Sequence, residues 1–198
     1  AWRVESLIDP PPDDWIAAHL APGDRLGFDP WLHTSGAADK LQAACARAGA
    51  ELIAVESNPI DTIWRERPAP PLSAVTIHSA DLAGEEVAAK LDRIRADLTR
   101  SGVAAQVLSD PHAVAWTFNI RGADVAHTPL PLSYALVPHE GRPTLFIDGR
   151  KLSNSVRDHL ERTAEIAAPE TLAPRLAELA RGGAVVGLDS ATAAEALT

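Results

Sequence analysis

Methionine is absent from the 198 residues, cysteine occurs once, and basic side chains are outnumbered by acidic ones, 18 to 27. The single cysteine, Cys45, excludes an internal disulfide and lies in a helical pattern where a small apolar side chain would pack. We therefore expect a reducing, cytoplasmic setting. The formal net charge of -9 would repel a phosphate backbone, so nucleic acid is not an expected partner.

Long hydrophobic runs are also missing. No stretch approaches the roughly 18 apolar residues that cross a bilayer, and the first residues lack the basic and apolar regions of a secretory signal. We expect neither membrane insertion nor export. Because the chain starts at Ala1 inside a strand-like pattern, residues 1–8, and has no initiator methionine, we expect it to be part of a longer protein.

The residues that are present fit a folded domain, with 46% hydrophobic and 23% charged side chains. Short strand-like and helix-like patterns alternate along the chain, which predicts an α/β fold. Strands are predicted at residues 25–29, 51–56, 103–109, 133–138, 143–148 and 184–189. Helices are predicted at residues 12–20, from Ser35 or Gly36 to Gly49, and at residues 85–102, 114–118, 153–163 and 173–182, with a last alanine-rich helix after residue 190.

A proline-rich segment divides this pattern. Pro68, Pro70 and Pro71 forbid helix and favour an extended connector, so we place a domain boundary there and predict units of residues 1–67 and 68–198. Within the second unit, the strands at 133–138 and 143–148 are joined by a short loop that contains Gly141. Two strands with such a loop predict a hairpin.

Several kinds of chemistry have no motif in the sequence. The seven histidines are scattered and none has the spacing of a helical zinc site, while Cys45 has no activating histidine near it. The glycine patterns of phosphate-binding loops and the GxSxG turn of serine hydrolases are absent. We therefore predict no catalytic residue and no metal ligand from motifs.

One loop gathers three polar side chains, Arg121, Asp124 and His127, within seven positions. Arg121 could clamp a carboxylate with its planar guanidinium, and His127 could donate to a carbonyl or titrate near neutral pH. The alternative is an Arg121–Asp124 pair that fastens the loop, with Gly122 providing backbone freedom. Spacing favours the fastening pair and leaves both interpretations open.

Residues 115–137, AWTFNIRGADVAHTPLPLSYALV, closely resemble a segment of the long, three-domain form of aminopeptidase P. This is the Xaa-Pro aminopeptidase family of the creatinase/prolidase superfamily. Three further segments agree with that family in the same order: GFDPWL at 27–32, NPIDTIWRERPAPP at 58–71 and TLFIDGRK at 144–151. Together the four segments extend over nearly the whole chain.

The resemblance implies two related α/β domains of ribonuclease H-like fold, each a mixed sheet flanked by helices, before a "pita-bread" catalytic domain. Residues 1–67 would be the C-terminal part of the first domain and residues 68–198 the second, with the catalytic domain absent from this chain. The family's dinuclear centre, usually manganese, is built from two Asp, one His and two Glu of that catalytic domain. No cofactor or metal ligand is therefore expected here.

The parent reaction would remove an N-terminal residue that precedes proline, by attack of a metal-activated water on the imide carbonyl. This chain alone is expected to be inactive. Arg121, Asp124 and His127 match a family loop that implies a substrate-cleft wall or an interdomain contact, although Thr128 replaces an Asn that is frequent there. The implied partners are the catalytic domain of the same chain, a second copy in a homodimer, and a proline-containing peptide.

A second interpretation is a stand-alone ribonuclease H-like binding module without a peptidase role. A nuclease is disfavoured, because the sequence marks no set of acidic residues for magnesium and the net charge of -9 opposes nucleic-acid binding.

Overall fold

The computed structural model describes residues 4–198 and divides into two compact units. Unit 1 comprises the chain up to Arg67 together with Ser190–Ala196 and Thr198, and unit 2 comprises Pro68–Asp189 with Leu197. The division falls at the start of the proline-rich connector. Residues 190–196 group with unit 1, although we expected the second domain to run to residue 198.

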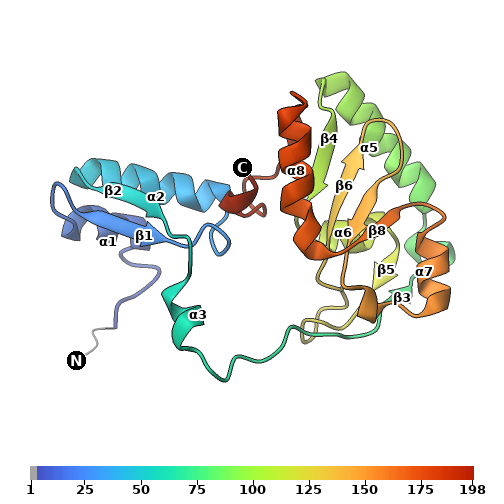
Figure 1. The fold of residues 1–198 in the computed structure, drawn as a ribbon, viewed down its shortest axis with the longest axis horizontal. Helices are drawn as coiled ribbons and strands as arrows, with labels where there is room; N and C mark the ends of the chain where they lie inside the picture. Colours follow the sequence, from blue (N-terminus) through green and yellow to red (C-terminus); the bar gives the residue numbers. More distant parts are fainter. Residues whose placement is uncertain (1–3) are drawn as a thin grey trace. The chain divides into compact units, whose positions relative to one another are not determined.

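Unit 1 is a small α/β layer (Figure 1). Strands β1 (Arg25–Phe28) and β2 (Glu51–Ala54) pair in parallel. Its helices are α1 (Pro12–His19), α2 (Ser35–Ala48) and α3 (Pro59–Ile63). Helix α3 is absent from the sequence predictions, because its single turn and a half is too short to show a periodicity.

Helix α2 follows its sequence signals closely. The Thr34 hydroxyl accepts a hydrogen bond from the backbone N–H of Ala37 at 3.2 Å, which caps the first turn. Gly49 ends the helix with φ of 71°, a left-handed conformation that glycine adopts without strain. Cys45 is fully buried on the inner face, so its predicted role as a small apolar core residue is confirmed.

The predicted alanine-rich helix after residue 190 is wrong. The chain makes turns there and ends in the short 3-10 helix η3 (Glu195–Leu197). Its backbone instead pairs with the segment around the start of α2: Ser35 N–H donates to Ala193 O at 3.0 Å, and Glu195 N–H donates to the His33 oxygen at 2.9 Å. Hydrogen bonds with a distant segment therefore outweigh the local preference of alanine for helix.

The strand predicted at residues 1–8 is also not found in its described part. Residues 4–8 adopt no strand, and residues 1–3 lie outside the described range. Val4, Leu7 and Ile8 are exposed. A strand-like pattern needs a neighbouring strand to accept its backbone hydrogen bonds, and the described residues provide none at this segment.

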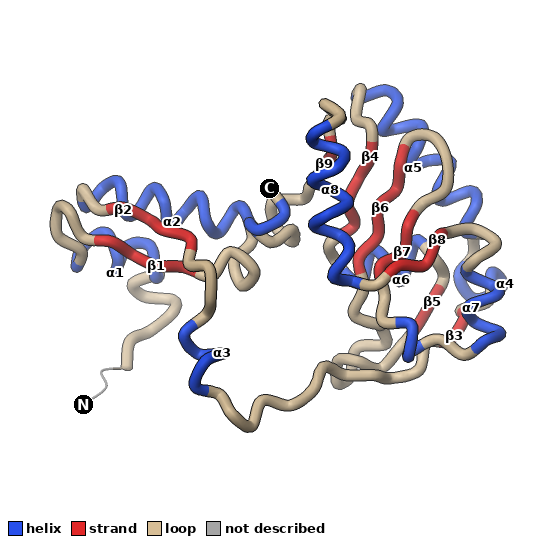
Figure 2. The backbone as a smooth tube through the Cα atoms, viewed as in Figure 1, coloured by secondary structure: helices blue, strands red, loops and turns tan. Residues whose placement is uncertain are grey.

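Unit 2 is built on a mixed sheet of five strands in the order β8-β7-β6-β4-β9 (Figure 2). The antiparallel centre pairs β4 with β6 and β6 with β7, and each outer strand is parallel to its neighbour. The strands are β4 (Ala105–Leu108), β6 (Tyr134–Pro138), β7 (Thr144–Phe146), β8 (Glu165–Ala167) and β9 (Val186–Gly187). A separate antiparallel pair joins β3 (Thr76–Ile77) to β5 (Ile120–Arg121).

Helices flank this sheet, so the predicted α/β class with a mixed sheet and flanking helices is confirmed (Figure 1). They are α4 (Ala80–Ala83), α5 (Val87–Ser101), α6 (Pro111–Thr117), α7 (Asn154–Leu160) and α8 (Leu172–Arg181), with 3-10 turns η1 (Gly149–Lys151) and η2 (Pro169–Thr171). No helix in the described range 4–198 combines the length and the apolar character that spanning a membrane requires.

The hairpin prediction is confirmed. Strands β6 and β7 are antiparallel, with Tyr134 opposite Phe146, and Gly141 in the connecting loop has φ of 93°. A side chain at that angle would be strained, so glycine is required there. Strand β8 was missed because its three residues are too few to show alternation.

Candidate functional site

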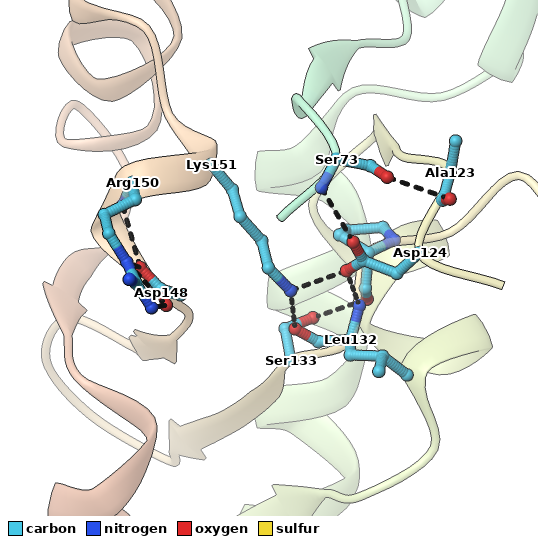
Figure 3. A network of polar contacts seen from close by, with 9 residues as sticks. Ser73, Ala123, Asp124, Leu132, Ser133, Asp148, Arg150 and Lys151 are labelled. Carbon is cyan, nitrogen blue, oxygen red and sulfur yellow. Dashed lines mark hydrogen bonds and ion pairs between the residues drawn. The ribbon is translucent and has the colours of Figure 1, made fainter. Parts of the chain in front are cut away.

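The loop that follows β5, residues 122–133, carries two of the predicted site residues and is fixed by a buried ion pair (Figure 3). The Lys151 ammonium donates to Oδ2 of Asp124 at 2.5 Å. The Asp124 side chain is 0% exposed and that of Lys151 is 5% exposed. Charges in such a dry setting interact strongly and need every partner they can find.

Asp124 also accepts two backbone hydrogen bonds. The N–H of Leu132 donates to Oδ2 at 2.7 Å, and the N–H of Ser73 donates to Oδ1 at 3.1 Å. The Ser73 hydroxyl donates in turn to the Ala123 carbonyl oxygen at 3.0 Å. One carboxylate thus joins the start of the loop, its end and the proline-rich connector (Figure 3).

Lys151 is placed by a capped 3-10 turn. The Asp148 carboxylate accepts from the backbone N–H of Arg150 at 2.9 Å and from the Arg150 guanidinium at 2.6 Å. The hydrogen bond from the Arg150 side chain, foremost, lowers the pKa of Asp148 to about 2. The turn therefore directs Arg150 toward Asp148 and leaves Lys151 to enter the interior, where its ammonium also donates to the Leu132 oxygen at 3.3 Å.

The predicted Arg121–Asp124 pair is not formed. Arg121 instead donates to two backbone oxygens, that of Ile120 at 2.8 Å and that of Ala115 at 3.4 Å. The loop is fastened through Asp124, as the second interpretation expected, but its partner is Lys151. Lys151 lies 27 positions further along the chain, so spacing within the loop could not identify it.

His127 lies at the tip of the loop. It is exposed and has φ of 60°, one of two non-glycine residues with positive φ among residues 4–198. The neighbouring turn is closed by a hydrogen bond from the N–H of Thr128 to the Val125 oxygen at 3.1 Å. The His127 imidazole is therefore exposed to solvent on a backbone that is strained at this residue. The contacts of Asp124 hold the same loop three residues earlier.

Beside Arg121 is a small, mostly apolar cavity of about 200 Å3. Its walls are formed by His112, Ala115, Trp116, Arg121, Pro129 and Leu130. An indole, a proline ring and one guanidinium are groups that would contact an apolar side chain with a nearby carboxylate or carbonyl.

A second buried lysine contacts Trp116, which lines this cavity, and sequence analysis did not identify it. Lys90 is 1% exposed; its ammonium donates to Oδ1 of Asn119 at 2.6 Å and to the Trp116 oxygen at 2.8 Å. It also lies 4.3 Å from the centroid of the Trp116 ring. Lys90 lies three positions after Val87 and four before Ile94, on the apolar face of α5. This spacing is the feature of the sequence that could have predicted its burial.

Burial is the main reason that the pKa of Lys90 is lowered from its ordinary value of 10.5. Glu85 opposes this shift, while Arg121 and Arg93 add to it. Among residues 4–198 no carboxylate pairs with this ammonium, and the nearby Glu85 pairs with Arg93 at 2.8 Å. Asn119, which has φ of 50°, completes the arrangement, because its side-chain amide donates to the backbone carbonyl oxygen of Glu85 at 2.8 Å.

No metal site can be assembled from the described residues. Within 4–198, no three His, Cys, Asp or Glu side chains gather closely enough to bind a metal ion. The buried carboxylate of Asp124 is already neutralised by Lys151. The residues present therefore do not fit a dinuclear centre.

Comparison with known proteins identifies the family. Residues 66–198 match the model of the creatinase/prolidase N-terminal domain. The chain is 36% identical over 186 residues to aminopeptidase P2 of Arabidopsis thaliana and 33% identical over 175 residues to a probable Xaa-Pro aminopeptidase P of Coccidioides posadasii. These alignments cover 92% and 88% of this chain, but only 26% and 27% of those relatives.

A solved structure agrees in fold. X-prolyl aminopeptidase from Caenorhabditis elegans, described as a cytosolic enzyme with a di-nuclear active site, superposes with a TM-score of 0.86 and 26% identity. The match covers 94% of this chain and 31% of that one. The chain thus spans about a quarter to a third of the length of these aminopeptidases, and it belongs to the creatinase/prolidase N-terminal domain family.

Proposed function

We propose that this chain is the non-catalytic portion of a metal-dependent Xaa-Pro aminopeptidase, an enzyme that removes N-terminal residues preceding proline. The observation that carries the proposal is the alignment of 92% of the chain with only 26% of aminopeptidase P2. The chain has no group of side chains that fits a metal pair within the described range, so the reacting centre would belong to a catalytic domain outside it.

In this assignment, residues 1–67 are the C-terminal part of a first amino-terminal domain and residues 68–198 are a second. The family match at residues 66–198 supports the second part. The parent would be a cytoplasmic homodimer with two manganese ions in its catalytic domain. The description of the Caenorhabditis elegans enzyme as cytosolic and di-nuclear supports the compartment and the presence of a metal pair.

The loop of Arg121, Asp124 and His127 would form a wall of the substrate cleft or a contact with the catalytic domain. Asp124 is the positioning residue, since its buried ion pair fixes the loop. His127 is exposed at the tip, where it can contact a peptide or another domain. Arg121, together with Trp116 and Pro129, lines the small cavity of about 200 Å3. This mostly apolar cavity suits an apolar side chain of a proline-containing peptide.

The first test is hydrolysis of an Xaa-Pro-Xaa peptide with added manganese, comparing this chain with one extended through the catalytic domain of its gene. We expect cleavage by the extended chain only, because the described residues offer no metal-binding cluster. Cleavage by the short chain would overturn the assignment as non-catalytic. Failure of the extended chain on every Xaa-Pro peptide would favour the stand-alone binding module.

The loop is tested in the extended chain with His127→Ala and Arg121→Ala. A cleft wall predicts a rise in KM of about tenfold, equivalent to one lost hydrogen bond or ion pair to substrate. His159→Ala is the matched control, because His159 is also an exposed histidine of unit 2. Unchanged KM and kcat in both loop variants would exclude the cleft wall and leave the interdomain contact.

A further inference from the structure

Unit 1 contains a cavity of about 690 Å3, which lies where strands β1 and β2 end. Because the two strands are parallel, the segments that follow them, residues 29–32 and 55–58, leave the sheet at the same edge. Ligands of open α/β sheets bind at this carboxyl edge. The volume is also within the range of ligand sites.

The lining of the cavity includes a hydrogen-bonded link between these two segments. Oδ2 of Asp29 accepts from the Asn58 amide at 2.8 Å, and Oδ1 accepts from the backbone N–H of Trp31 at 2.8 Å. Asn58 in turn caps α3, with its Oδ1 accepting from the Ile60 N–H at 2.9 Å. These contacts, that with Asn58 foremost, lower the pKa of Asp29, so its carboxylate is charged at neutral pH.

One guanidinium already lies on the wall of this cavity. Arg67 donates to Oδ1 of Asp61 at 2.6 Å, and its guanidinium carbon is 5.9 Å from the centroid of the Trp64 ring. Arg67 and Asp61 both line the cavity, so the chain itself shows a guanidinium paired with a carboxylate of this site, with the Trp64 indole nearby.

The same cavity has a second acidic and aromatic set that has no cation. Asp29 accepts from uncharged N–H groups, and Glu56 has no hydrogen-bond or ion-pair partner among residues 4–198. The nearby base, His33, bonds to the backbone oxygen of Asp29 rather than to its carboxylate. Trp31 is 53% exposed beside them.

We propose that this second set binds the guanidinium of an arginine side chain from a polypeptide, with the charge against Glu56 and Asp29 and the alkyl stem over Trp31. Planar guanidinium groups pair with carboxylates and stack on indoles. A polypeptide is preferred to a free amino acid because Leu32, 70% exposed, and Val55 add apolar wall on which neighbouring residues can pack. The site is independent of the proposed peptidase role.

The test uses the 198-residue chain and follows the backbone amide signals of residues 29–32 and 55–58 by NMR. The probes are acetyl-Leu-Arg-Leu-amide, the same peptide with neutral citrulline in place of arginine, and free L-arginine. We expect saturable shifts with the arginine peptide and binding at least tenfold weaker with the citrulline peptide, because citrulline has the same shape without the charge. Free L-arginine is expected to bind at least fivefold more weakly than the arginine peptide.

Variants assign the contacts. Glu56→Gln and Trp31→Leu should each weaken binding of the arginine peptide about fivefold. Both side chains are exposed, and each contributes one contact, an ion pair from Glu56 and a cation–π contact from Trp31. Glu170→Gln, an exposed carboxylate of unit 2, is the matched control and should change nothing. Equal binding of the citrulline peptide, or shifts confined to other residues, would overturn the site. Equal binding of free arginine would overturn the polypeptide as its ligand.

Discussion

Unit 2 buries two lysines, Lys90 and Lys151, and the charge of each ammonium is stabilised by a different kind of partner. Lys151 faces a buried carboxylate, Asp124, which also accepts two backbone N–H groups. Lys90 faces two uncharged oxygens and the face of Trp116. The first region matches charge with charge, while the second stabilises a cation with dipoles and an indole ring.

The difference indicates what each region contributes. At Lys151 the ion pair connects three separate stretches of chain and fixes the loop that carries His127. Loss of the pair should therefore loosen the whole loop, residues 122–133. At Lys90 the contacts join α5 to the end of α6 and to Asn119. A lysine without a carboxylate keeps its proton less firmly, and this region should respond to pH.

The largest expected effect is that of Asp124→Ala. It leaves the Lys151 ammonium buried without a counter-charge and two N–H groups without an acceptor, which should lower the free energy of unfolding of unit 2 by about 3–5 kcal/mol. Urea unfolding followed through the indole signal of Trp116, the one tryptophan between residues 68 and 189, measures this loss.

Two further variants sharpen that result. Asp97→Ala removes an exposed carboxylate that pairs with Arg100, and it should cost less than about 1 kcal/mol. In the double variant Asp124→Ala/Lys151→Met the unpaired charge is gone, so the cost should be smaller than for Asp124→Ala alone. A double variant that is less stable than either single variant would contradict the buried ion pair as the source of the effect.

Lys90→Met should cost less than Asp124→Ala, about 1–3 kcal/mol. It removes the Lys90 donor from Oδ1 of Asn119 and leaves the Trp116 backbone oxygen with the longer hydrogen bond from the Asn119 N–H, but it leaves no buried charge. The same urea experiment with the Trp116 signal applies. If Lys90→Met proved the more damaging change, the contrast between the two lysines would be wrong.

The pH dependence should distinguish the two regions. The pKa of Lys90 is lower in the folded chain than the 10.5 of the unfolded one. Between these two values the unfolded chain binds more protons, so the stability of the wild type rises with pH relative to that of Lys90→Met. Titration of the Lys90 side-chain 13C signal should give a midpoint below 10.5, and a midpoint at or above it would refute the assignment.

The smallest effect is expected for His127→Gly, in the same loop as Asp124. Glycine adopts the φ of 60° without strain but adds freedom to the unfolded chain, and the exposed imidazole has little packing to lose. The free energy of unfolding should stay within about 1 kcal/mol of wild type. A larger loss would mean that His127 supports the fold rather than being displayed by it.

Sequence patterns predicted regular, self-contained elements well. Helix α5, with its stripe of Val87, Leu91, Ile94 and Leu98, and the β6–β7 hairpin are as expected, because their signals lie within a few neighbouring residues. The short β8 strand and the non-helical end after residue 190 were not foreseen. Both depend on backbone hydrogen bonds to segments far away in the sequence.

The candidate loop shows the same limit for side chains. Its three polar residues were visible in the sequence, and so was a fastening role for Asp124. The partner was wrong, because nothing local to Arg121 and Asp124 indicates that η1 brings Lys151 to the carboxylate. Arg121 is drawn instead to backbone oxygens at the end of α6 and in β5.

By itself, the sequence determined the α/β class, the helices and hairpin with local signals, and the family resemblance that the comparisons confirmed. Tertiary structure alone decided which charges are buried, which partners satisfy them and which loops meet at the cavity of unit 1. The physical reason is range: periodicity and capping act over a few residues, whereas desolvation and pairing of charge depend on every group that folding brings near.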